Sequence, residues 1–170
     1  MTLRDRYLVA GYLAMSLFGS SCLILAQSAK SYGNGLIAVA DIPLPGPAAR
    51  FDYQSFDPAS GRLYIAHMDA DQLVVFDVRD RKLVANLDGF RRVHGVFVAP
   101  EVDRLFASAT GDHQVIAVDT QTLKIVGRAG PIVYPDGLTY APKQKKVFVS
   151  DEYGGVDAVI DATSNTLIAK

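Results

Sequence analysis

The sequence predicts an all-β protein, a β-propeller of four-stranded antiparallel blades, and three observations lead to this fold class. Landmark residues recur with a 42-residue period through three copies. Each copy contains four short runs of β-branched, aromatic and aliphatic residues, separated by turn residues. Several runs are apolar on both faces, as strands are when their sheet lies between two other sheets. Repeats of this length with four strands each are typical of propeller blades.

The repeat keeps its register without a gap from Phe51 to Lys170. Four kinds of landmark share the 42-residue step: a turn proline, an aliphatic–aromatic pair, a turn aspartate and a second aliphatic pair. They are Pro58, Pro100 and Pro142; Leu63-Tyr64, Leu105-Phe106 and Val147-Phe148; Asp77, Asp119 and Asp161; and Leu83-Val84, Ile125-Val126 and Leu167-Ile168. We therefore expect blades at residues 51–92 and 93–134 and an incomplete blade at 135–170.

The first copy shows how each blade divides into strands. We expect these at Phe51–Phe56, Leu63–His67, Leu73–Phe76 and Leu83–Leu87. The turn between the first two contains Pro58, which fixes φ, and Gly61, which accepts a positive φ. No helical periodicity follows the N-terminal segment, so the blades account for the rest of the chain.

Residues 1–28 have the three parts of a secretory signal peptide. Arg4 and Arg6 precede an apolar stretch from Tyr7 to Ala26, and Ala26-Gln27-Ser28 offers small residues for cleavage. An uncleaved membrane anchor is the alternative, although several Gly and Ser residues dilute the apolar stretch. We expect an exported protein, periplasmic or extracellular, which contacts the membrane only through this segment.

Composition places the chain among globular proteins, with 49% hydrophobic and 21% charged residues and a formal net charge of −1. Nucleic acid is not an expected partner, because phosphate binding needs a clustered basic surface. Cys22 is the only cysteine, and it lies in the predicted signal peptide. Cleavage would leave a mature chain with neither a disulfide nor a thiolate nucleophile.

Two stretches of the repeat resemble a known family. The third copy, from Pro135-Asp136-Gly137-Leu138-Thr139-Tyr140-Ala141-Pro142 to Val159-Ile160-Asp161-Ala162-Thr163-Ser164-Asn165-Thr166, resembles the YVTN β-propeller repeat. The first copy, with Phe51-Asp52-Tyr53 and Gly61-Arg62-Leu63-Tyr64-Ile65-Ala66-His67, is similar to the exported YncE-like members of that family. The resemblance is specific for fold and much less so for function, since propellers carry unrelated activities.

The resemblance implies a ring of about seven blades, and closed propellers need at least about four. Three copies do not close a ring, so we expect the sequence to be the N-terminal part of a larger propeller. Residues 29–50 are interpreted as an N-terminal strand and linker, with Leu36–Ala40 as a lone strand that could latch the last blade. The alternative is a ring that two or more short chains form by self-association.

One repeat position offers a candidate site for a ligand or metal. It is occupied by Asp52, His94 and Asp136, each the second residue of the strand that opens a blade. Equivalent side chains of successive blades converge on the propeller axis, and mixed Asp/His sets suit divalent cations such as Ca²⁺, Mn²⁺ or Zn²⁺. The structural alternative is that these residues form hydrogen bonds with the neighbouring blade's backbone and hold the turn.

The loops after the second strands supply further candidate ligand residues, His67, Asp69 and Asp151, at one rim of the propeller. A solvated acidic loop is the alternative for the two aspartates. No Gly-x-Ser-x-Gly elbow, His-Glu-x-x-His motif or phosphate-binding Gly-rich loop is present in the sequence.

These observations favour an exported binding or scaffold module for a small ligand or a protein partner. The alternative is a propeller enzyme, either a lactonase-like hydrolase or a quinoprotein-dehydrogenase-like subunit. Such an enzyme would first require a divalent metal at Asp52, His94 and Asp136. No catalytic residue is assigned.

Overall fold

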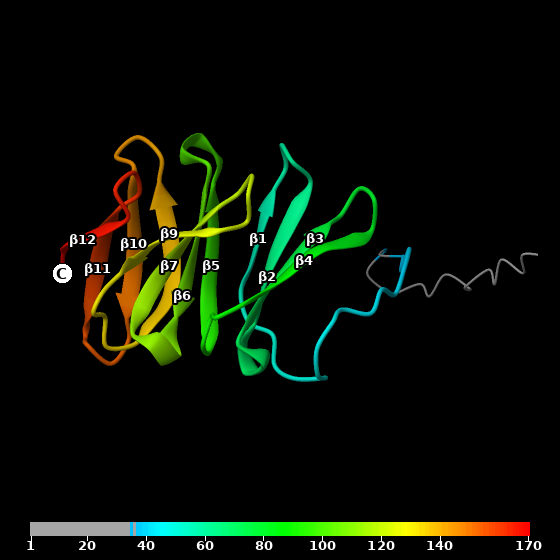
Figure 1. The fold of residues 1–170 in the computed structure, drawn as a ribbon, viewed down its shortest axis with the longest axis horizontal. Helices are drawn as coiled ribbons and strands as arrows, with labels where there is room; N and C mark the ends of the chain where they lie inside the picture. Colours follow the sequence, from blue (N-terminus) through cyan, green and yellow to red (C-terminus); the bar gives the residue numbers. More distant parts are fainter. Residues whose placement is uncertain (1–34, 36) are drawn as a thin grey trace, which may run out of the picture. The chain divides into compact units, whose positions relative to one another are not determined.

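The computed structural model describes residue 35 and residues 37–170. The strands of the described part lie between Gln54 and Ala169, within the unit Ile42–Lys170 (Figure 1). The predicted signal peptide and Cys22 lie outside the described residues.

The lone strand expected at Leu36–Ala40 is not observed in the residues that the structure describes. Leu36 lies outside them, Ile37 forms an isolated β-bridge, and residues 38–40 belong to no strand. A strand depends on backbone hydrogen bonds to a partner along its length, and a single bridge supplies too few of them.

Three four-stranded antiparallel sheets confirm the predicted fold class, and each sheet pairs its strands in chain order. The first blade contains β1 (Gln54–Asp57), β2 (Arg62–His67), β3 (Gln72–Asp77) and β4 (Lys82–Asp88). The second contains β5 (Val93–Ala99), β6 (Arg104–Ala109), β7 (Gln114–Asp119) and β8 (Ile125–Ala129). The third contains β9 (Pro135–Ala141), β10 (Lys146–Asp151), β11 (Val156–Asp161) and β12 (Thr166–Ala169). The three blades form no closed ring within residues 37–170.

The helical segments of the described residues are short 3₁₀ turns. They are η1 (Met68–Ala70), η2 (Pro100–Val102) and η3 (Thr110–Asp112). In residues 35 and 37–170, no helix has the length and apolar character needed to cross a membrane.

Turns with a left-handed residue recur in every blade with the 42-residue step. The positive-φ positions are Gly61, Asp103 and Lys145; Asp71, His113 and Gly155; and Arg81, Leu123 and Asn165. Only two of these nine are glycine, although a positive φ costs most other residues about 1–2 kcal/mol. The pairing register of the sheets, rather than glycine, therefore determines these turns.

The repeat aspartates Asp77, Asp119 and Asp161 close the turn before the fourth strand of each blade. Their carboxylates accept hydrogen bonds from the backbone N–H groups of Asp80, Thr122 and Ser164, at 2.8, 2.8 and 3.0 Å. These backbone hydrogen bonds are the main reason that the pKa of all three carboxyls lies below its usual value. The regular spacing of this landmark therefore has a local structural cause.

The blades stack face to face in chain order (Figure 1). We call the face of a blade that packs on the next blade its forward face, and the opposite one its rear face. The forward face of the first blade carries Tyr64, Ala66, Leu73 and Val75, which form one buried cluster with Leu105, Ala107, Ile116 and Val118 on the rear face of the second.

The second interface repeats the first. The forward face of the second blade carries Phe106, Val115 and Ala117, and these form a buried cluster with Val147, Val149, Ala158 and Ile160 on the rear face of the third. Full burial of one large apolar side chain contributes about 1.5–3 kcal/mol. The stacked faces are therefore the main source of stability in this part of the chain.

The first strands of the blades also approach one another closely. The hydroxyl of Ser55 in the first blade accepts a hydrogen bond from the backbone N–H of Val98 in the second, at 3.0 Å. Gly95 in β5 lies so near the carbonyl of Asp136 in β9 that a Cβ atom would overlap it. A glycine is needed at this position because two backbones meet there.

Arg81→Gly is expected to raise the free energy of unfolding by about 0.5–1 kcal/mol, because Arg81 is exposed and has a φ of 54°. Gln121→Gly is the matched control at an exposed turn residue outside the positive-φ set, and it is expected to lower that free energy by a similar amount. Urea denaturation measures both. Equal destabilisation by the two variants would contradict the role of the left-handed position.

Candidate functional site

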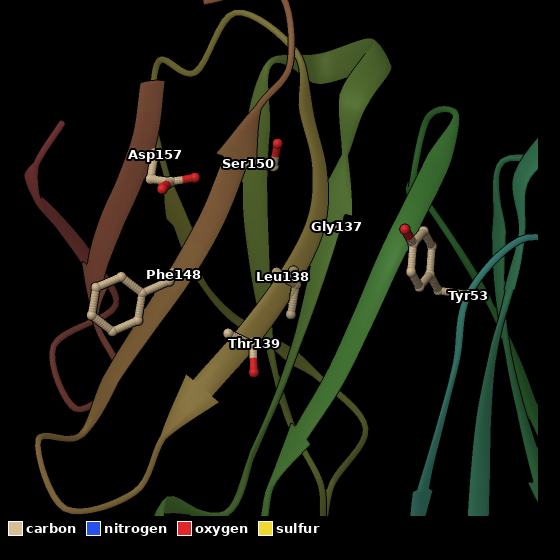
Figure 2. A pocket seen from close by; sticks show the side chains of 7 residues that line it. All are labelled: Tyr53, Gly137, Leu138, Thr139, Phe148, Ser150 and Asp157. Carbon is tan, nitrogen blue, oxygen red and sulfur yellow. The ribbon is translucent and has the colours of Figure 1, made fainter. Parts of the chain in front are cut away.

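Within residues 37–170, no sheet covers the forward face of the third blade, and a pocket of about 410 Å³ lies on it. Phe148 is 40% exposed there, whereas its repeat equivalents Tyr64 and Phe106 are 0% and 1% exposed. The lining residues are Tyr53, Gly137, Leu138, Thr139, Phe148, Ser150 and Asp157 (Figure 2). None of the sequence-predicted site residues is among them.

Cross-strand pairing brings the polar side chains of this pocket onto the same face as Phe148. Thr139 in β9 is the direct partner of Phe148 in β10, and Ser150 in β10 is the partner of Asp157 in β11 (Figure 2). The blade therefore presents an aromatic ring beside two hydroxyls and one carboxylate. All four side chains belong to exposed residues.

Asp157 departs from the repeat. The equivalent residues of the first two copies are Leu73 and Val115, which are buried between blades. A carboxylate buried in such an interface without a partner would be costly. Any surface that covers the third blade must therefore offer a cation or hydrogen-bond donors near Asp157.

Tyr53 reaches the pocket from the first blade (Figure 2). The repeat equivalents of Tyr53 are Gly95 and Gly137, so the next two blades have no side chain in its way. A Cβ atom at Gly137 would lie 3.4 Å from the Tyr53 hydroxyl. The phenol, 50% exposed, therefore forms one wall of the pocket.

The lining of this pocket combines one aromatic ring with hydroxyl groups and a single carboxylate. Ser150 has a carboxylate opposite it in Asp157, but no histidine lines the pocket. A serine nucleophile needs a neighbouring base to activate it. The lining instead supplies an apolar ring, hydroxyls and one negative charge for a bound partner.

The predicted metal set is not brought together. Asp52 lies before β1 and pairs with Arg50 at 3.1 Å, while His94 and Asp136 lie in β5 and β9. Over residues 35 and 37–170, no three His, Cys, Asp or Glu side chains are arranged to hold a metal ion. The convergence expected on the axis therefore does not produce a ligand group in these blades.

His94 is instead buried in a hydrogen-bond network that joins the second blade to the third. Its Nδ1 lies 2.7 Å from the carbonyl of Arg92 and 2.9 Å from the hydroxyl of Thr110, which itself donates to the carbonyl of Pro135. Because a carbonyl can only accept, Nδ1 carries the proton. Nε2 then accepts from the hydroxyl of Tyr134 at 3.3 Å. Both ring nitrogens are therefore used, which agrees with the structural alternative for this residue.

His67 does not lie on the rim surface. It is fully buried, and its ring stacks on Phe51 at a centroid distance of 4.0 Å. Gly46 packs against it, since a Cβ atom there would be 3.0 Å from Cε1 of His67. Neither ring nitrogen has a hydrogen-bond partner in the described structure. His67 is therefore inaccessible to a ligand in this arrangement.

The two rim aspartates differ from each other. Asp69 is exposed in η1, as expected for a solvated loop. Asp151 is 1% exposed, and its carboxylate accepts hydrogen bonds from the backbone N–H groups of Val133, Tyr134 and Gly154 at 3.0, 2.7 and 3.1 Å. Burial acts to raise the pKa of this carboxyl, but the three hydrogen bonds outweigh it and hold the pKa below its usual value. Asp151 therefore organises the loop that enters the third blade.

Sequence reasoning missed the residues that line the pocket. One signal was available, because alignment of the three copies shows Asp157 opposite two aliphatic residues and Tyr53 opposite two glycines. Breaks in the apolar pattern of a repeat indicate positions with another role. The exposure of Phe148 had no such signal, since an aromatic residue stands there in every copy.

The chain matches no family model and no curated protein. Among solved structures, it is similar to a chain of the hydrazine synthase of Kuenenia stuttgartiensis, with a TM-score of 0.64 and 19% sequence identity. The match covers 81% of this chain and 38% of that one, so this chain spans well under two thirds of its length. That propeller-containing protein supports the propeller fold alone. In all, 657 chains of solved structures match, and a fold so widely used selects no single activity.

Asp151→Asn is expected to lower the free energy of unfolding at pH 7 by roughly 1–3 kcal/mol, because the amide offers only one acceptor oxygen to the three backbone N–H groups that the carboxylate binds. The native carboxyl has the lower pKa, so its ionisation stabilises the fold above about pH 4, and this contribution disappears as the pH falls through the native pKa. Urea denaturation between pH 7 and pH 3 should show the two proteins converge towards acid pH. If the difference in the free energy of unfolding between the two proteins does not change with pH, the ionised carboxylate of Asp151 does not have the stabilising role described here.

Proposed function

We propose that this chain is an exported β-propeller module of the YVTN type that acts in binding or as a scaffold. Its candidate binding surface is the forward face of the third blade, which would take a small ligand or a protein partner. A single observation carries the proposal: Phe148 is 40% exposed where both equivalent aromatic residues are buried.

The character of the face supports a protein partner. An exposed aromatic ring with a polar rim is the usual composition of a protein-binding patch. Here Phe148 is the apolar centre, and Thr139, Ser150 and Asp157 surround it. The same face of the first two blades already binds a sheet, so its shape suits a flat apolar partner.

Export rests on the sequence of residues 1–28, with its basic start, apolar middle and small-residue exit. The enzyme alternative has no comparable support. It requires a metal bound through His94, and both nitrogens of that ring form hydrogen bonds within the protein.

Protection of a cysteine placed on the face tests the binding function. Ser150→Cys and Glu152→Cys are made in a Cys22→Ala background, so that each variant has one thiol. Residues 150 and 152 are both exposed, but only Ser150 lines the pocket. In the native envelope fraction, Cys modification by a maleimide should be at least tenfold slower at position 150 than at position 152. The denatured proteins are the control, in which the two thiols should react with the maleimide at the same rate. If the two thiols also react at the same rate in the native envelope fraction, the face is uncovered and the proposal is wrong.

A further inference from the structure

We infer that residues 43–51 form a pH-sensitive strap, which closes on His67 while the imidazole is neutral and opens when the imidazole is protonated. These residues, which we call the strap, lead into β1 and belong to the same unit as the blades, Ile42–Lys170. None of them lines the pocket on the third blade, so the strap is separate from the candidate binding surface.

His67 is enclosed beneath the strap. It is 0% exposed, and its ring stacks on Phe51 with the centroids 4.0 Å apart and the planes 12° apart. The strap also packs on the ring at Gly46, where a Cβ atom would be 3.0 Å from Cε1 of His67. The equivalent residues of the other blades are Ala109, which is apolar, and Asp151, whose carboxylate accepts three backbone hydrogen bonds. A buried imidazole at this position is therefore particular to the first blade.

The two ring nitrogens of His67 are inaccessible to solvent, and neither has a hydrogen-bond partner in the described structure. A further segment of the protein could reach them only by displacing the residues that enclose the ring. The closed strap therefore holds the imidazole in a dry site, which suits the neutral form of the ring better than the charged one.

Protonation makes this site unfavourable. An imidazolium carries an N–H on each ring nitrogen, so it needs two acceptors and a polar environment for its charge. Gln72, the cross-strand partner of His67, brings one uncharged acceptor close to the ring. Its Oε1 is unpartnered and lies 3.2 Å from the point where a Cβ atom at Gly46 would be, and Nδ1 of His67 lies 3.4 Å from the same point. One amide oxygen does not satisfy two donors and a buried charge.

No neighbouring carboxylate compensates that charge in the described residues. The charged groups of the strap and of the strands and turns next to His67 are Asp52, Asp69, Asp71, Asp88 and Arg50. None of these carboxylates forms a hydrogen bond with the imidazole. Asp52 pairs with Arg50, Asp69 is exposed, Asp71 accepts from the backbone N–H of Arg92, and Asp88 accepts from Nε2 of Gln72 at 2.9 Å.

The strap is the part of this site that is free to move. Pro43, Pro45 and Pro47 have no backbone N–H to donate. Among the hydrogen bonds of the described residues, one joins the strap to the blade, from the backbone N–H of Asp69 to the carbonyl of Arg50 at 3.3 Å. By contrast, β2 is paired with strands on both sides. Opening the strap therefore costs fewer contacts than moving the strand that carries His67.

The direction of the pH effect follows from proton linkage. The open form exposes the imidazole to water and binds the proton more readily than the closed form, so acid shifts the population towards the open form. An imidazole in water changes charge at about pH 6.5. Since the closed form favours the neutral ring, the strap opens below about pH 6.5 and closes again as the pH rises.

A nitroxide spin label on the strap tests the inference. Ala48→Cys in a Cys22→Ala background places one label on an exposed strap residue, and Gln121→Cys places one on an exposed turn of the second blade. Between pH 7.5 and pH 5.0, the rotational correlation time of the label at position 48 should fall at least threefold, and that at position 121 should not change. A label at position 48 whose mobility is the same at both pH values would overturn the strap.

His67→Phe keeps an aromatic ring against Phe51 but cannot be protonated, so the label at position 48 should stay immobile down to pH 5.0. His113→Asn is the matched control, since His113 is exposed and asparagine tolerates its φ of 58°. This variant should respond as the wild type does. A pH response that persists in His67→Phe would overturn the role of His67.

The wild-type sequence offers a measurement that does not depend on how a substitution at position 67 folds. The NMR signal of the Cε1 proton of His67 should shift at the same pH at which the label at position 48 becomes mobile. Midpoints that differ by more than about one pH unit would show that protonation of His67 and opening of the strap are not coupled, and would overturn the inference.

Discussion

Burial of aliphatic and aromatic side chains between consecutive sheets is the interaction on which this structure depends. Each blade is apolar on both faces, so a blade cannot bury its own side chains and needs a neighbour on each side. The middle blade has both neighbours, and its strands β6 and β7 are almost entirely buried. No sheet within residues 37–170 covers the forward face of the third blade, so Phe148 is exposed there.

Polar side chains reinforce this stacking at the places where the chain passes from one blade to the next. His94 links its own blade to Tyr134 in the linker, and Asp151 holds the same linker through the backbone N–H groups of Val133 and Tyr134. These residues have the chemistry of catalytic or metal-binding groups, but their donors and acceptors are already used within the protein. His94 and Asp151 therefore act as structural groups at the boundary between the second and third blades.

The 42-residue repeat was enough to predict the three sheets and the turn aspartates, because both depend on local pattern and spacing. The role of His94 could not be predicted in the same way. Its partners Thr110 and Tyr134 lie 16 and 40 residues away in two different loops, and only the stacked blades bring them together. The exposure of Phe148 could not be predicted from the sequence either. Phe148 and its equivalent Phe106 are both phenylalanine, and Phe106 is buried only because another blade packs on it. Residues 38–40 show the converse, since their sequence is β-prone but they belong to no strand of the described structure.

An aromatic residue at the repeat position of Tyr64, Phe106 and Phe148 stabilises a blade only when the next blade covers it. The most direct test is the free energy of unfolding of Phe106→Ala and Phe148→Ala, measured by urea denaturation at a concentration where the chain is monomeric. Phe106 is 1% exposed and Phe148 is 40% exposed, so the first substitution should cost about 3–5 kcal/mol and the second less than about 1 kcal/mol. Equal costs for the two substitutions would contradict the account.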